Sequence, residues 1–145
     1  MNMLVSTAAV SATAVHADQA AEDPIFAAMN RHRQASVATK NAWDKVHDAF
    51  AEAKRELGEG VQIESKVMPG ETILATCWSD VHDAIPPEEY PEEYESARML
   101  VDQYFKEKQS IAERILDADP DNFAEPEMDA EDQALDDLVD TVPTS

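Results

Sequence analysis

Cysteine, glycine and basic residues are scarce in this chain of 145 residues. Cys77 is the only cysteine, which excludes an intramolecular disulfide and a cysteine-based zinc site. Three glycines are too few for the glycine-rich loops that bind phosphates. With 11 basic against 31 acidic residues, a formal charge of −20 argues against direct nucleic-acid binding, which needs a basic surface. No apolar run reaches 18 residues, so we expect no membrane-spanning helix.

The charge is unevenly distributed. All basic residues lie between Arg31 and Arg114, so both ends of the chain are acidic or neutral. Apolar residues make up 43% of the chain and charged residues 29%, which suits a single small domain with poorly folding flanks. We expect the globular structure in the middle of the chain.

A long helix is predicted from Pro24 to Leu57. Asp23 can cap its free amides, proline is tolerated in its first turn, and Gly58 suits its carboxyl end. Every seventh residue from Met29 is bulky except Ser36, and a row of alanines lies beside this row. The two rows are Met29, Ser36, Trp43, Phe50 and Leu57, and Ala28, Ala35, Ala42 and Ala49. The alanine row predicts close approach of another helix, with Trp43 and Phe50 filling the remaining space.

The rest of the middle predicts a mainly α fold. A small β-hairpin is expected near 61–78, turning at Pro69-Gly70, followed by a short helical turn around Val81. Proline and glutamates then start a second helix that ends near Asp117. We predict one domain over 23–117, a long antiparallel two-helix hairpin with the β-hairpin in its connection, and we expect it to form a homo-oligomeric helical bundle.

Residues 1–22 are predicted to be a leader outside the fold. The first 17 residues carry no charge, and Val15-His16-Ala17 fits a small-x-small cleavage site, but a basic region before the apolar stretch is absent. A disordered leader would leave the protein in the cytoplasm. An export signal, with the true start further upstream, would place it in the periplasm.

Residues 118–145 are predicted to be an acidic disordered tail. The last 29 residues contain 11 acids and no base, a composition that does not fold alone. Its apolar residues could order on a basic protein partner, which makes Phe123, Leu135 and Leu138 candidate interaction residues.

Tyr90 and Tyr94 are two further interaction candidates. They lie in the repeated sequence Pro-Glu-Glu-Tyr, and tyrosines among glutamates can bind basic or cationic partners. The alternative is an acidic helix start whose tyrosines pack on Trp78 or Phe50.

Other chemically suggestive residues have structural explanations. Cys77 and His82, with Asp80 or Asp83, could form a thiolate pair, but a lone cysteine beside a tryptophan is typical of a buried residue. A metal site formed by His32 and His47 would need a further ligand. A calcium loop could begin with the three aspartates at 117, 119 and 121, but Asn122 stands where glycine is needed and Met128 where glutamate is needed. We therefore expect no catalytic residue, cofactor or metal.

The first third of the chain resembles a group of small uncharacterised bacterial helical proteins, many with twin-arginine-type leaders. The resemblance rests on the Ala-rich leader, Asp23-Pro24-Ile25-Phe26-Ala27-Ala28 and Arg31-His32-Arg33, and the arginine pair of such leaders is absent here. It implies a helical body and a bacterial origin, and no catalytic residue.

Three functional hypotheses follow. The first is a non-enzymatic helical interaction protein with an acidic partner-binding tail. The second is an acidic mimic of nucleic acid that occupies the binding site of another protein, and the third is a small enzyme of unrecognised type.

Overall fold

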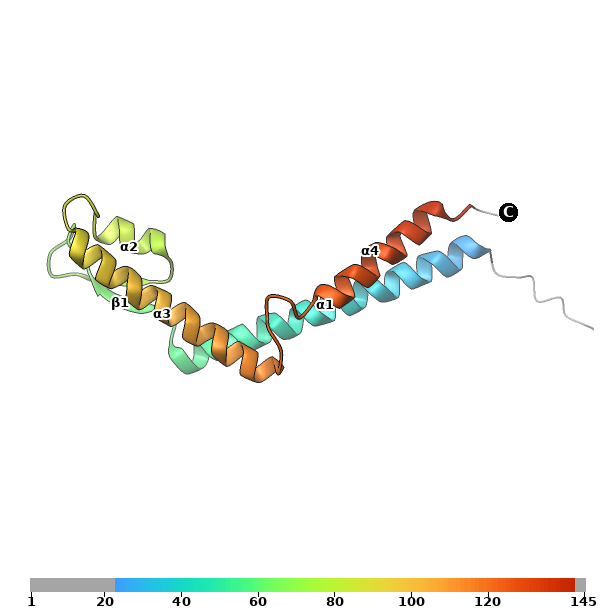
Figure 1. The fold of residues 1–145 in the computed structure, drawn as a ribbon, viewed down its shortest axis with the longest axis horizontal. Helices are drawn as coiled ribbons and strands as arrows, with labels where there is room; N and C mark the ends of the chain where they lie inside the picture. Colours follow the sequence, from blue (N-terminus) through green and yellow to red (C-terminus); the bar gives the residue numbers. More distant parts are fainter. Residues whose placement is uncertain (1–22, 143–145) are drawn as a thin grey trace, which may run out of the picture.

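The computed structural model describes residues 23–142, and this part of the chain is mainly helical, with one small antiparallel sheet. Its elements are α1 (Pro24–Leu57), β1 (Val61–Glu64), β2 (Thr72–Ala75), α2 (Trp78–Ala84), α3 (Pro91–Leu116) and α4 (Glu125–Asp140). Figure 1 shows an elongated molecule with the strands and α2 at one end. The predicted fold class is confirmed at this level. The leader predicted over residues 1–22 lies outside the described residues.

Helix α1 begins and ends where its sequence signals predict. The Asp23 side chain accepts a hydrogen bond from the Ile25 backbone N–H at 3.1 Å, and Pro24 occupies the first turn. At the other end Gly58 has a φ of 95°, and its N–H donates to the Lys54 carbonyl. The 34 residues of the helix span about 50 Å at about 1.5 Å per residue.

The β-hairpin also forms as predicted. Strand β1 pairs with β2 in an antiparallel register that places Val61 opposite Ala75 and Glu64 opposite Thr72. Gly60 must be a glycine here, because a Cβ at this position would lie 2.5 Å from the Ala75 carbonyl oxygen. The chain thus turns from α1 into the sheet without a side chain in the way.

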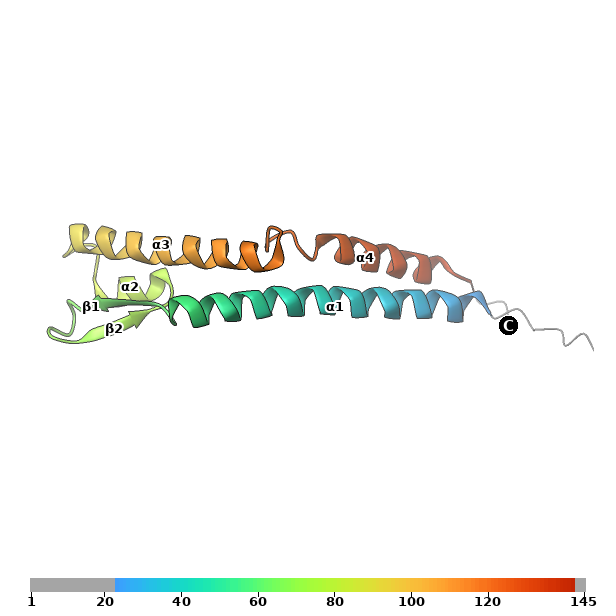
Figure 2. The same cartoon turned by 90° about the horizontal axis from the view of Figure 1, so that it is seen from below.

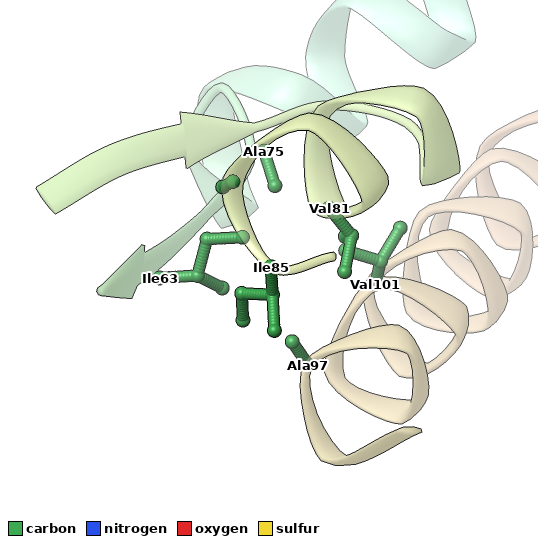
Figure 3. Packing of buried hydrophobic residues seen from close by; sticks show 7 residues of the cluster. Ile63, Ala75, Val81, Ile85, Ala97 and Val101 are labelled. Atoms are coloured by element: carbon green, nitrogen blue, oxygen red, sulfur yellow. The ribbon is translucent and has the colours of Figure 1, made fainter. Parts of the chain in front are cut away.

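The head of the molecule, formed by β1, β2, α2 and the first half of α3, contains the main hydrophobic cluster. Its buried members are Ile63, Ala75, Val81, Ala84, Ile85, Ala97 and Val101. Figure 3 shows these side chains turned toward one another between the strands, α2 and α3. Burial of each valine and isoleucine side chain in this cluster stabilises the fold by about 1.5–3 kcal/mol, and this packing holds the two-stranded sheet against the helices.

The rest of the molecule is a rod in which α3 and α4 lie one after the other along α1 (Figure 2). The Tyr104 hydroxyl donates to the Gly58 carbonyl at 2.8 Å, and the Thr39 hydroxyl donates to the Glu127 carbonyl at 3.0 Å. α1 is therefore paired with two helices in succession rather than with the single helix that the sequence predicts. The reason is length, because α3 has 26 residues and its first half packs on the head, which leaves the first half of α1 uncovered.

The predicted disordered tail over 118–145 is wrong for Glu125–Asp140, which form helix α4. Its residues at 127, 131, 134, 138 and 141 are half-buried, at the alternating spacing of four and three that places them on one face of a helix. That face packs along α1, and the acids between these positions point into solvent. The composition of this segment does not favour folding alone, and α1 orders it by packing against it, although α1 lies about 90 positions earlier in the sequence.

Within residues 23–142 no helix has the length and apolar character needed to cross a lipid bilayer.

Candidate functional site

The alanine row of α1 lies at the centre of its helix contacts, and this pushes the bulky row to the edge. Ala28, Ala42 and Ala49 are buried to 5% exposure or less, whereas Met29 is 42% exposed and Trp43 is 38% exposed. Small residues at the centre let the backbones approach closely, so no space remains there for a tryptophan. The prediction that Trp43 fills the interior is therefore wrong.

Helices α3 and α4 repeat this arrangement. On α4, Met128, Leu135 and Val139 each directly follow a half-buried residue that faces α1, and all three are exposed. On α3, Phe105 directly follows the buried Tyr104 and is 38% exposed. α4 thus has an apolar row just outside its contact with α1, and α3 adds one apolar residue at the corresponding place.

These exposed rows lie on the same side of the rod. α1 runs antiparallel to α3 and to α4, as Figure 2 shows. Because α-helices are right-handed, the residue that follows a facing residue turns to the same side on both helices of an antiparallel pair. We call this surface the rod face and define it by six exposed residues: Met29, Trp43, Phe105, Met128, Leu135 and Val139.

A shallow groove of about 340 Å³ lies where α1 meets the end of α4. Met29, His32, Arg33 and Leu138 are among its lining residues. Leu138, a candidate from the sequence, therefore contributes to the floor of a groove beside the rod face. Leu135, the neighbouring candidate, is 43% exposed on the rod face itself.

Polar contacts at the same edge hold α4 in register. The nearby Thr39 and Ser36 side chains, together with His32, lower the pKa of Glu131 below its usual value. Glu127 places one carboxylate oxygen in the contact between the helices, without a hydrogen-bond partner among the described residues. The charged form of Glu131 thus favours the observed packing.

Phe123 lies on the opposite side of the rod. It is half-buried and lines a groove of about 700 Å³ with Ile115, Lys45 and Asp48. Lys45 and Asp48 directly precede the buried Val46 and Ala49, which places this groove on the flank away from the rod face. Phe123 is thus separated from Leu135, although both lie in the predicted tail.

Tyr90 and Tyr94 belong to the head. Both are partly buried against its hydrophobic cluster, and the Tyr94 ring meets the His82 ring edge-on with centroids 6.3 Å apart. The two tyrosines therefore do not form an exposed pair, and within the part of the chain that the structure describes neither ring is paired with the ring of Trp78 or Phe50. Trp78 instead donates its indole N–H to Asp102 at 2.8 Å.

Asp80, one of the residues considered for catalysis, forms hydrogen bonds at the start of α2. Cys77 is exposed, and Asp80 accepts hydrogen bonds from the Thr76 and Cys77 backbone N–H groups at 2.6 and 3.1 Å. These bonds and that of the Thr76 hydroxyl lower the pKa of Asp80 and fix the start of α2. The structure does not direct this carboxylate toward His82.

The proposed calcium loop and histidine pair are likewise not assembled. Asp119 accepts hydrogen bonds from the Asp121 backbone and the Asn122 side chain, and so stabilises the turn between α3 and α4. The His47 ring lies 6.2 Å from the Trp43 ring. Across residues 23–142 no three or more His, Cys, Asp or Glu side chains are grouped in a way that could hold a metal ion.

Comparison with known protein families, with curated proteins and with solved structures found no match to this chain. The rod face is therefore identified from the geometry of this chain alone. Sequence reasoning missed Trp43 and Met29 as surface residues, and the signal that could have found them is the alanine directly before each of them.

Proposed function

We propose that this protein is a non-enzymatic helical interaction protein, and that its rod face packs against the rod face of a second copy. The observation that carries the proposal is the exposure of six large apolar side chains on one side of the rod. Monomeric soluble proteins rarely expose many large apolar side chains on one side, and such surfaces mark interaction sites.

Composition and symmetry both favour a second copy as the occupant. Aromatic residues and methionine are enriched in protein interfaces, and the rod face contains Trp43, Phe105 and two methionines. Its residues extend along α1 from Met29 to Trp43 and continue over α3, which matches a long helical surface rather than a compact ligand. Two such surfaces related by a twofold axis would each bury the apolar row of the other, as in helical bundles.

A substitution on the rod face tests this proposal. Leu135→Gln removes one apolar contact from each copy, so its effect on a symmetric dimer counts twice. At about 1 kcal/mol for each contact, the dissociation constant should rise by at least about tenfold. Sedimentation equilibrium of the full chain over a wide concentration range measures this constant directly.

Ile115→Gln is the matched control. Ile115 is 45% exposed, close to the 43% of Leu135, but it lies on the opposite flank of the rod. Its substitution should leave the dissociation constant unchanged. A wild-type chain that stays monomeric at submillimolar concentration would refute the proposal, as would equal effects of the two substitutions.

A further inference from the structure

The free edge of β1 offers unused backbone hydrogen-bonding groups. Next to the paired strands, the Ser65 N–H donates to the Glu71 carbonyl at 2.9 Å. Because hydrogen-bonded and non-hydrogen-bonded residue pairs alternate along an antiparallel ladder, this bond shows which residues of β1 are bonded to β2. Val61 and Ile63 then exchange hydrogen bonds with β2, and the N–H and carbonyl groups of Gln62 and Glu64 point away from it. A two-stranded sheet has no further strand to pair with these groups.

A groove of about 490 Å³ runs along this edge between β1 and α3. Its lining includes the buried apolar residues Ile63, Ile85 and Ala97. Figure 3 shows these three side chains close together where β1 meets the first half of α3. The groove therefore has an apolar floor next to the unpaired backbone groups of Gln62 and Glu64. This free stretch ends at Lys66, whose N–H on the same edge donates to the Ala84 carbonyl at 2.8 Å.

Acidic residues border the groove. Glu64 comes from β1, and Glu92 and Glu93 come from the first turn of α3, against the single basic residue Lys66. A negatively charged rim around an apolar floor selects a ligand with positive charge and a small apolar anchor. The net charge of −20 acts in the same direction at longer range.

We propose that this groove binds an extended segment of a basic partner protein, which adds to the free edge of β1 as a third strand. Side chains alternate along a strand, so the partner residue opposite Ile63 points to the apolar floor, and the residues on either side of it lie next to Gln62 and Glu64. The partner segment thus carries an apolar residue opposite Ile63 and a basic residue beside Glu64, and the neutral Gln62 accepts a second basic residue on the other side. Backbone hydrogen bonds supply affinity and the side-chain pattern supplies specificity.

The partner segment belongs to another protein. In this chain, basic residues two positions apart occur as Arg31 and Arg33 and as Lys106 and Lys108, and both pairs lie within helices. They cannot join the sheet without unfolding α1 or α3. This site does not depend on the rod face, so it stands or falls independently of self-association.

Fluorescence anisotropy with a labelled eight-residue peptide of alternating lysine and valine tests the proposal on the full chain. We expect saturable binding that weakens at least about tenfold when Glu92 and Glu93 are both changed to glutamine, because two attractive charges are lost. Peptides methylated on the backbone nitrogen of every lysine or of every valine separate backbone pairing from simple charge attraction. One of the two should fail to bind and the other should bind, since only every second amide faces β1.

Two proline variants test the edge itself. Gln62→Pro removes an N–H on the free edge of β1, and Leu74→Pro removes its counterpart in the same rung on the outer edge of β2. Gln62→Pro should abolish peptide binding and Leu74→Pro should preserve it, with circular dichroism used to verify that both variants are folded. Equal binding by both methylated peptides would overturn the proposal, as would peptide binding that survives Gln62→Pro in a folded protein. If a proline variant does not fold, the methylated peptides test the proposal with the wild-type chain.

Discussion

At the scale of single residues, Asp80 shows how one half-buried aspartate joins two elements. It accepts hydrogen bonds from the backbone N–H and hydroxyl of Thr76 and from the backbone N–H of Cys77, at the point where β2 ends and α2 begins. These donors favour the charged carboxylate and lower its pKa below the value of 3.8 that is usual for aspartate. All three hydrogen bonds end on the same carboxylate oxygen, an arrangement that appears only in the structure.

Asp80→Ala should destabilise the protein by about 1 kcal/mol at neutral pH, as loss of a helix cap does. A carboxylate with a lowered pKa stabilises the folded state above its unfolded pKa, and this contribution disappears as the pH falls through the folded pKa. The difference between wild type and Asp80→Ala in urea unfolding should therefore shrink below about pH 3.8. Asp83→Ala is the control with little effect at either pH, and a difference for Asp80→Ala that persists undiminished at pH 2.5 would contradict the assignment.

At the scale of secondary-structure elements, α4 marks the boundary of what the sequence could predict. The ends of α1, the β-hairpin and α3 follow from local sequence signals. Asp23 before Pro24 marks the start of α1, and Pro69-Gly70 marks the turn of the hairpin, where Gly70 has a positive φ. α4 also begins with a proline and two glutamates in its first turn, but only Ala134 and Leu138 are apolar among the five positions that face α1, so its sequence does not show a packing face. Its order depends on an uncovered stretch of α1 far away in the sequence. The rod face depends on the same long-range pairing, so it too could not be predicted from local patterns.

A proline in α4 tests whether this helix protects the first half of α1. Ala134→Pro breaks the backbone hydrogen bonding in the middle of α4, a change of about 3 kcal/mol or more in a helix interior. Hydrogen exchange of the α1 amides should then accelerate over residues 25–40, while residues 46–57, which α3 covers, provide an internal control with unchanged exchange. Unchanged exchange over residues 25–40 would mean that α4 does not cover α1 in solution.

At the scale of the whole molecule, charge opposes one proposed interaction and favours the other. Each copy carries a net charge of −20, so face-to-face pairing of two rods brings together two strongly negative bodies. A basic peptide in the groove beside β1 is attracted by the same field. Salt screens both effects, since the Debye length falls from about 30 Å at 0.01 M to about 10 Å at 0.1 M ionic strength.

The two interactions should therefore respond to salt in opposite directions. Between about 10 and 500 mM sodium chloride, the dissociation constant for self-association should fall by at least about tenfold, because screening removes repulsion and leaves apolar contacts almost untouched. Over the same range, the dissociation constant for the lysine–valine peptide should rise, because screening removes attraction. Sedimentation equilibrium and anisotropy of the same preparation measure both constants. If self-association weakened with salt, charge pairs rather than the rod face would hold the copies together. If peptide binding did not change with salt, the glutamates that border the groove would not contribute to it.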